Sequence, residues 1–156
     1  MQDINTRIRA VANQKAADAL VLPWTAAQWQ RLATILERRE LATGDLLVRR
    51  GERTSQAYLV EAGHLQVFVS GGPPGSHRIT TLHAGAIVGE PALFIDAPRS
   101  ASVEAMTPGV VWAFANARLE TLANEEPRLV LAMLRAAGAV MAVRMRANLE
   151  RGIPTT

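Results

Sequence analysis

Two charged side chains flank a short apolar run in the segment VGEPALFIDAPRSASVEA, which covers residues 88–105. Glu90 and Arg99 lie nine positions apart, and Gly89 and Pro91 stand on either side of the acidic residue. Glycine allows a tight turn and a close approach to the backbone, and proline is favoured at the start of a helix. The pattern predicts a short helix over residues 91–95, followed by a turn that brings Arg99 back toward Glu90.

Such an arrangement is suited to a small anionic ligand. The free N–H groups of a first helical turn, here those of Ala92 and Leu93, attract anions by their orientation and by the helix dipole. The planar guanidinium of Arg99 can bind two phosphate oxygens at once. A phosphate would repel Glu90, so we expect this carboxylate to accept a hydrogen bond from a ribose hydroxyl, as acidic residues do in dinucleotide-binding folds. The segment therefore indicates a compact nucleotide, and a simple Glu90–Arg99 ion pair is the alternative.

The composition is that of one soluble globular domain. The 156 residues are 49% hydrophobic and 20% charged, with a formal net charge of +3. The arginines are dispersed and form no basic stripe, so we expect no direct nucleic-acid binding. The chain has no cysteine, which favours a cytoplasmic location, and no apolar run of the roughly 18 residues that cross a membrane. The first residues also lack the apolar core of a secretory signal.

Three zones follow one another along the chain. Residues 1–38 have helical character, and Thr25 is a suitable N-cap for a helix over residues 26–39. Residues 39–115 hold many short apolar or alternating runs separated by glycine-containing turns, which predict a small antiparallel barrel, sandwich or roll. Residues 116–151 are helical again, with a short helix and then one of about 24 residues that begins at Pro127. All three zones are expected to form one α+β domain.

Two other groups of residues were weighed as functional sites. His64, His77 and His83 lack the spacing of the metal site of a cupin barrel, so surface or loop positions are predicted for them. The other group consists of the three tryptophans, Trp24, Trp29 and Trp112, whose positions in the predicted elements favour core packing over a stacking platform. Ser100 has no base nearby in the sequence, so we expect no catalysis.

The chain resembles the cyclic nucleotide-binding domain family, which includes bacterial catabolite activator proteins, protein kinase A regulatory subunits and nucleotide-gated channels. The resemblance rests on Gly89-Glu90 and, after a short helix, on Arg99-Ser100-Ala101, which match the phosphate-binding cassette of the family. It extends to the turn glycines Gly44, Gly51 and Gly63 and to the entry into the last helix. Pro91 and Val88 depart from the family pattern, but neither change removes a charged group.

The resemblance implies a fold and a set of ligand-binding residues. The fold would be a jelly-roll-like antiparallel β-roll, flanked by N-terminal helices and a long C-terminal helix. Glu90 would bind the ribose 2′-hydroxyl and Arg99 the exocyclic phosphate oxygens. The implied ligand-binding residues are Gly89, Glu90, Ala92, Arg99, Ser100 and Ala101, and the candidates for capping the base are Val140, Met141 and Arg144. The implied ligand is cAMP, with cGMP as the alternative, and no further cofactor or metal is implied.

The function implied is sensing, in which ligand binding moves the cassette helix and closes the last helix over the base. Val130, Leu134, Ala137, Met141 and Met145 recur at helical spacing, and we expect a homodimer through this last helix. We also expect a protein partner or a fused effector domain, because the chain is either a standalone adaptor or the regulatory piece of a larger transporter, channel or transcription regulator. The alternative is a degenerate cassette that binds no ligand and acts as a protein-interaction scaffold.

Overall fold

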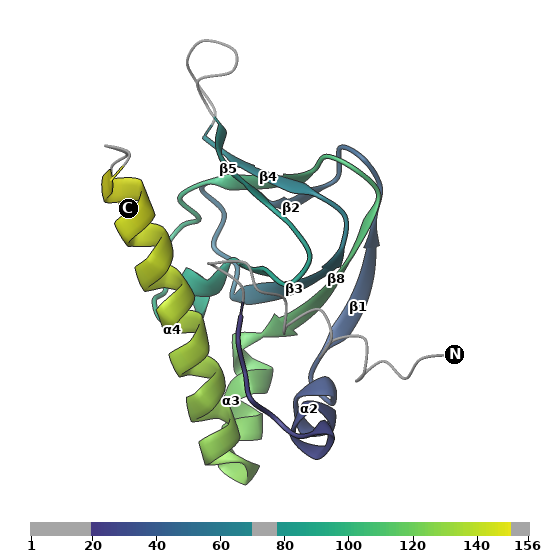
Figure 1. Ribbon diagram of the computed structural model, residues 1–156, viewed down its shortest axis with the longest axis vertical. Coiled ribbons are helices and arrows are strands. Elements are labelled where there is room, and N and C mark those ends of the chain that lie inside the picture. The colour runs from purple at the N-terminus through teal and green to yellow at the C-terminus, as the bar shows by residue number, and fades with distance from the viewer. Residues whose placement is uncertain (1–19, 70–77, 151–156) are drawn as a thin grey trace.

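The computed structural model describes residues 20–69 and 78–150, and the strands and helices are labelled in Figure 1. The helical character predicted for residues 3–19 and the loop predicted at residues 71–76 lie outside the described residues.

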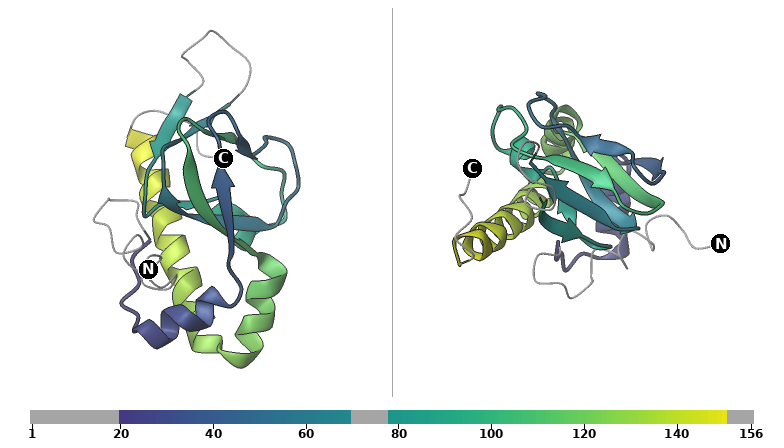
Figure 2. Two further views of the ribbon diagram at one scale, coloured as in Figure 1. Left: turned by 90° about the vertical axis from the view of Figure 1, so that its right-hand side faces the viewer. Right: turned by 90° about the horizontal axis from the view of Figure 1, so that it is seen from above.

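The described strands form two four-stranded antiparallel sheets that curve around a common interior (Figures 1 and 2). One sheet has the order β1-β8-β3-β6 and the other β2-β7-β4-β5. The strands are β1 Glu37–Leu41, β2 Leu46–Val48, β3 Gln56–Ala62, β4 Leu65–Phe68, β5 Arg78–Leu82, β6 Ile87–Val88, β7 Ser102–Ala105 and β8 Gly109–Ala115. The predicted α+β class with an antiparallel β-roll is confirmed. The predicted turn positions of Gly44, Gly51 and Gly63 are also confirmed, since all three have positive φ angles.

Along β3 and β8, the two central strands of the first sheet, successive side chains point alternately into two different apolar cores. Val60 of β3 and Val111 of β8 point into the roll and belong to its interior cluster. Leu59 and Trp112 point to the opposite face and pack against the helices. The same strands therefore line the interior of the roll and anchor the helical layer outside it.

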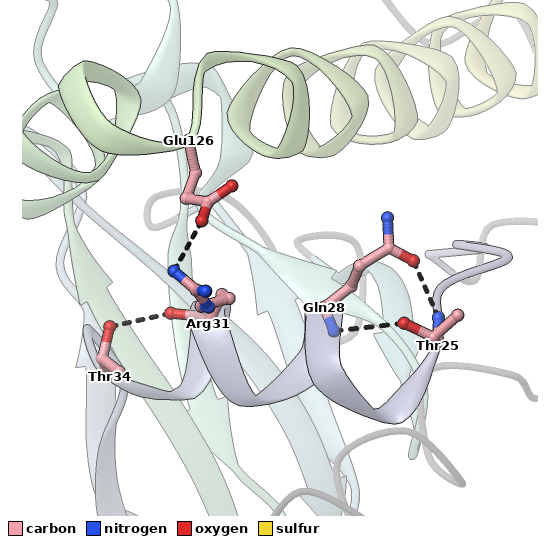
Figure 3. Close-up of polar contacts among 5 residues, drawn as sticks. All are labelled: Thr25, Gln28, Arg31, Thr34 and Glu126. Atoms are coloured by element: carbon pink, nitrogen blue, oxygen red, sulfur yellow. Dashed lines mark hydrogen bonds and ion pairs between the residues drawn. The ribbon is translucent and has the colours of Figure 1, made fainter.

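Helix α2, Ala26–Ala33, begins at the predicted N-cap but is shorter than predicted (Figure 3). Thr25 and Gln28 form a reciprocal capping box, and near the other end of the helix Arg31 Nη1 lies 2.6 Å from Glu126 Oε1. The prediction that the helix continues to residue 39 is wrong, because Glu37–Leu41 is strand β1 and pairs with β8 along its whole length. The pairing satisfies the backbone hydrogen bonds of these residues, and this outweighs the high helix propensity of Glu, Arg and Leu.

The predicted pair of C-terminal helices is confirmed. Helix α3 spans Asn116–Glu125, and α4 spans Pro127–Glu150 and runs alongside the roll (Figures 1 and 2). The apolar stripe predicted on α4 is only partly right, since Val130 and Ala137 are buried but Met145 is 48% exposed. The buried face of α4 consists of Leu129, Val130, Met133, Ala137 and Val140. Among the described residues, no helix has the length and apolar character that a membrane span requires.

The helical layer is held to the sheet by one apolar cluster that contains all three tryptophans. Trp24, Trp29 and Trp112 are at most 9% exposed, and the rings of Trp24 and Trp29 meet edge to face at 5.0 Å. The prediction that the tryptophans pack in the core is confirmed. The prediction of surface histidines is confirmed for His64 and His83, which are exposed, while His77 lies outside the described residues.

Candidate functional site

The segment between β6 and β7 begins with the predicted turn and short helix. Gly89 adopts the left-handed conformation with φ 74°, and a 3-10 helix, η1, follows over Glu90–Leu93. The N–H of Ala92 donates to the carbonyl of Gly89, and that of Phe94 to the carbonyl of Pro91. The helix is one turn, tighter and shorter than an α-helix over residues 91–95, and it buries Glu90 and Leu93.

Arg99 returns to this turn and is itself buried, with 8% of its surface exposed. Its Nε donates to Thr54 Oγ1 at 2.9 Å, its Nη1 to the Gly89 carbonyl at 3.0 Å, and its Nη2 to the Gln56 carbonyl. A side chain at position 89 would place its Cβ only 2.8 Å from Nη1 of Arg99. Glycine at this position is therefore needed both for the positive φ angle and for the approach of the guanidinium.

Burial and the neighbouring side chains have opposing effects on the pKa of Arg99. Burial lowers the pKa of the guanidinium, while the proximity of Tyr58 and Glu90 counteracts this shift. Its three hydrogen-bond acceptors are neutral oxygens. Since a guanidinium remains protonated in proteins, the site holds a positive charge that has been largely removed from water. Such a charge favours an anionic partner.

Glu90 forms an ion pair with the last helix and not with Arg99. Its Oε1 lies 2.8 Å from Nη1 of Arg144 on α4, and the two side chains are only 8% and 21% exposed. The alternative interpretation, in which Glu90 and Arg99 simply pair with each other, is therefore not what the structure shows. The cassette carboxylate instead connects η1 to a helix residue 54 positions further along the chain.

The other predicted site residues are distributed around this centre. Ser100 is exposed, and Ala101 is half-buried at the start of β7. Of the capping candidates, Arg144 reaches the cassette, Met141 is half-buried, and Val140 packs in the helical core with 3% of its surface exposed. The fold thus brings Gly89, Glu90, Arg99 and Arg144 into one cluster.

Two partners of Arg99, one just before β3 and one at its first residue, were missed by the sequence analysis. Thr54 and Gln56 supply acceptors to Arg99 across 45 and 43 positions of sequence. The side chain of Gln56 also accepts from Tyr58 and Arg39, and the Arg39 guanidinium lies 5.8 Å from the centre of the Tyr58 ring. No local pattern marks these residues, because it is the strand pairing that places them beside the cassette.

A separate cavity of about 640 Å³ lies between the cassette and the C-terminal helices. Leu93 and Phe94 line it from the cassette, Leu119 from α3, and Val130 and Leu134 from α4. Glu90, Arg99 and Ser100 do not line it, but the predicted ligand residue Ala92 and the Arg99 partner Thr54 do, so the cavity lies next to the polar cluster. The cavity leaves space between η1 and helices α3 and α4.

Comparisons with known proteins identify the family and agree with the fold. The family model described as "Cyclic nucleotide-binding domain" matches residues 38–126, and the chain belongs to this family. A crystal structure of a cyclic nucleotide-binding domain from Methylobacillus flagellatus superposes with a TM-score of 0.80 at 21% identity, covering 94% of this chain and 81% of that one.

Two curated relatives match over shorter stretches. An NTE family protein of Mycobacterium tuberculosis is 36% identical over 109 residues, which are 70% of this chain and 18% of the relative. A cAMP-dependent protein kinase regulatory subunit of Blastocladiella emersonii is 35% identical over 86 residues, which are 55% of this chain and 21% of the relative. The chain therefore spans about a fifth of the length of the curated relatives that it matches.

The hydrogen bonds of Arg99 predict a stability effect that can be measured without any ligand. The substitution Arg99→Ala leaves two backbone carbonyls and a hydroxyl without their donor, so it should lower the free energy of unfolding by about 2–4 kcal/mol. Urea denaturation followed by circular dichroism measures this. The control is Arg53→Ala, which removes an exposed ion pair with Asp96 and should cost less than about 1 kcal/mol. Equal losses in the two variants would contradict the structural role of Arg99.

Proposed function

We propose that this chain is a cyclic nucleotide sensor that binds cAMP at the cassette and signals through its last helix. The observation that carries the proposal is the buried Arg99 guanidinium, which is held beside Gly89 and Glu90 in a chain of the cyclic nucleotide-binding family. The role proposed is sensing and not catalysis.

Arg99 is the proposed phosphate ligand. Its guanidinium has five N–H donors in a planar fork, and its present acceptors include the carbonyls of Gly89 and Gln56. A phosphate would replace neutral acceptors with charged oxygens, and charge-assisted hydrogen bonds are roughly twice as strong as neutral ones. The negative charge would also offset the burial that lowers the pKa of Arg99. Backbone N–H groups of Ala92, Ser100 and Ala101 are proposed to complete the phosphate contacts.

Glu90 is the proposed ribose ligand, and it can serve ribose and helix α4 together. A carboxylate offers about four lone-pair positions on two oxygens, and Arg144 Nη1 donates to one of these oxygens, Oε1. A neutral ribose hydroxyl does not compensate a buried carboxylate as a guanidinium does, so Arg144 is expected to stay in place. The 2′-hydroxyl then binds the remaining carboxylate positions, and ligand and helix stabilise each other through Glu90.

In the proposed mechanism, the contact of Glu90 with both the ligand and Arg144 couples ligand binding to the docking of α4. A ligand that binds better when α4 is docked shifts the population toward the docked arrangement, and docking of α4 in turn raises the affinity for the ligand. The cavity between η1 and the C-terminal helices provides the space for this adjustment. Because the curated relatives are about five times longer than the matched region, we propose that the moving helix acts on a fused or separate effector.

The proposed ligand is cAMP, with cGMP as the alternative. The similarity to a cAMP-dependent protein kinase regulatory subunit supports this choice. Calorimetric titration of the purified chain with cAMP, cGMP and 5′-AMP should give binding of the cyclic nucleotides, with cAMP the tighter, and weaker or no binding of 5′-AMP. Arg99→Ala should weaken cAMP binding by about 2–5 kcal/mol, or roughly 30-fold to several thousand-fold. Absence of heat with both cyclic nucleotides at millimolar concentration would contradict the proposal.

The role of Arg144 gives a second measurable outcome. Arg144→Ala removes the charge that compensates Glu90 and should weaken cAMP binding about 5- to 50-fold, while Arg144→Lys should retain part of the affinity. The control Arg146→Ala changes an exposed arginine on the same helix and should leave the affinity unchanged. Calorimetry measures all three variants. Tighter binding in Arg144→Ala would show that the ion pair competes with the ligand, contrary to the mechanism proposed here.

Homodimerisation through α4 is also proposed, with a seam that differs from the predicted one. Val130 and Ala137 are buried within this chain, so they are not available to a partner. The exposed residues Ala142, Met145 and Leu149 follow a three-four spacing on another face of the helix, and Leu131, eleven positions before Ala142, lies on the same face. A second copy of α4 would cover this face.

Light scattering coupled to size-exclusion chromatography tests the proposed seam. The unmodified chain should have the mass of a dimer, and the double variant Met145→Glu with Leu149→Glu should have the mass of a monomer, because charges would then lie in the seam. Ala139→Glu, at an exposed α4 position outside the seam, should remain dimeric. A monomeric unmodified chain would rule out dimerisation through α4.

A degenerate cassette that acts as a protein-interaction scaffold is the second candidate function. In its favour, the charged cassette residues already have partners within the chain, and Phe94 and Ile95 beside them are 44% and 61% exposed. The calorimetric titration distinguishes the two functions, since a scaffold would bind neither cyclic nucleotide.

A further inference from the structure

Two histidines from separate connections meet on the surface of the roll. His64 lies between β3 and β4, and His83 follows β5. Leu65 of β4 is paired with Leu82 of β5, and this register places the next residue on each side at the same end of the strand pair. The two Nδ1 atoms are 2.7 Å apart, the ring centroids 4.8 Å apart, and the rings lie at 80° to each other.

The pair is held in position by backbone contacts while its rings remain exposed. His64 N donates to Thr107 Oγ1 at 3.1 Å, and the His64 carbonyl accepts from Met106 N at 2.8 Å. The His83 carbonyl accepts from Ala86 N at 3.1 Å. Both connections are thus anchored on the roll, and both side chains are accessible to solvent.

We propose that His64 and His83 form a two-histidine chelate for a divalent late transition-metal ion, with Cu²⁺ bound most tightly and Ni²⁺ next. Two nitrogens that occupy neighbouring positions of a square-planar ion at about 2.0 Å are about 2.8 Å apart, close to the separation of the Nδ1 atoms. A modest outward rotation of the exposed rings directs both lone pairs at one ion. The ring whose Nδ1 carries the shared proton loses it and takes up a proton at Nε2, so both imidazoles bind as neutral ligands through Nδ1, and water fills the other positions of the ion.

The small number of protein ligands disfavours zinc as the preferred ion. Tetrahedral Zn²⁺ with bonds of about 2.0 Å holds its nitrogens about 3.3 Å apart and takes four ligands in structural sites. Within residues 20–69 and 78–150, no cluster of three or more histidine, cysteine, aspartate or glutamate side chains is suited to a metal. A pair of nitrogens on an open surface instead suits ions that bind neutral imidazole strongly with only two protein ligands, as the order of metal affinities favours for Cu²⁺.

A metal at this site would link two segments whose histidines are 19 positions apart in the sequence. His83 precedes Gly85 and Ala86, whose backbones pair with Val60 of β3, and this connection continues through β6 to Gly89. An ion held by both histidines would therefore fasten the connection that enters the cassette to the turn between β3 and β4. Because it binds the folded chain, it should raise the thermal midpoint, and the rise should grow with the logarithm of the free ion concentration above the Kd.

The test uses the untagged chain and Cu²⁺ as the probe. Calorimetry should show one Cu²⁺ per chain, and electron paramagnetic resonance should show coupling to two nitrogens. His64→Ala and His83→Ala should each weaken Cu²⁺ binding at least about tenfold and abolish the two-nitrogen spectrum. His77→Ala is the matched control, because it removes the third histidine of the chain and should change neither measurement.

The thermal midpoint without metal, measured for each variant, separates loss of the site from loss of the fold. Both histidines are exposed, so the variants should melt within a few degrees of the unmodified chain. Equal Cu²⁺ affinity in the unmodified chain and in the double variant His64→Ala with His83→Ala would overturn the proposal, as would an equal loss in His77→Ala. Cyclic nucleotide binding is measured separately with Arg99 intact, so failure of the metal site would leave the proposed sensing function untouched.

Discussion

The structure around the cassette depends on one buried positive charge. Arg99 is only 8% exposed, and its hydrogen bonds join the cassette turn at Gly89 to the start of β3 at Thr54 and Gln56. The chain therefore holds a desolvated guanidinium in a fixed orientation, which is costly unless its donors are satisfied. Neutral oxygens satisfy them in the structure, and phosphate oxygens would satisfy them with opposite charge. The same geometry thus contributes to folding and provides the basis for anion binding.

The ion pair between Glu90 and Arg144 extends this local constraint to the whole domain. Glu90 belongs to a helix of a single turn, which could not signal far by itself. Arg144 belongs to a helix of 24 residues whose first half is buried against the sheet and α3 and whose last residues are largely exposed. The ion pair therefore joins the carboxylate to the part of α4 that is least fixed by packing.

Much of the fold could be predicted from local patterns, but the pairing partners could not. The glycine turns, the strands around Leu59 and Trp112 and the helix that begins at Pro127 all follow from alternation, turn residues and helix-start residues. The sequence ERREL at residues 37–41 has the composition of a helix end, and only its pairing with β8 makes it a strand. The cassette was recognisable because its residues are close in sequence. Thr54, Gln56 and the pair of His64 with His83 were not recognisable, since their proximity arises from strand register.

The first sheet is packed on both of its faces, and it therefore forms a fixed frame beside the cassette. The inner faces of β3 and β8 pack the interior of the roll, while their outer faces anchor the helical layer through Leu59 and Trp112. Close packing on both faces makes the sheet a poor site for movement. The cassette joins the roll to the helical layer at a different point, next to a cavity of about 640 Å³, where Leu93 and Phe94 face α3 and α4. Movement on ligand binding is therefore expected in η1 and the later part of α4, with the sheet as the fixed frame.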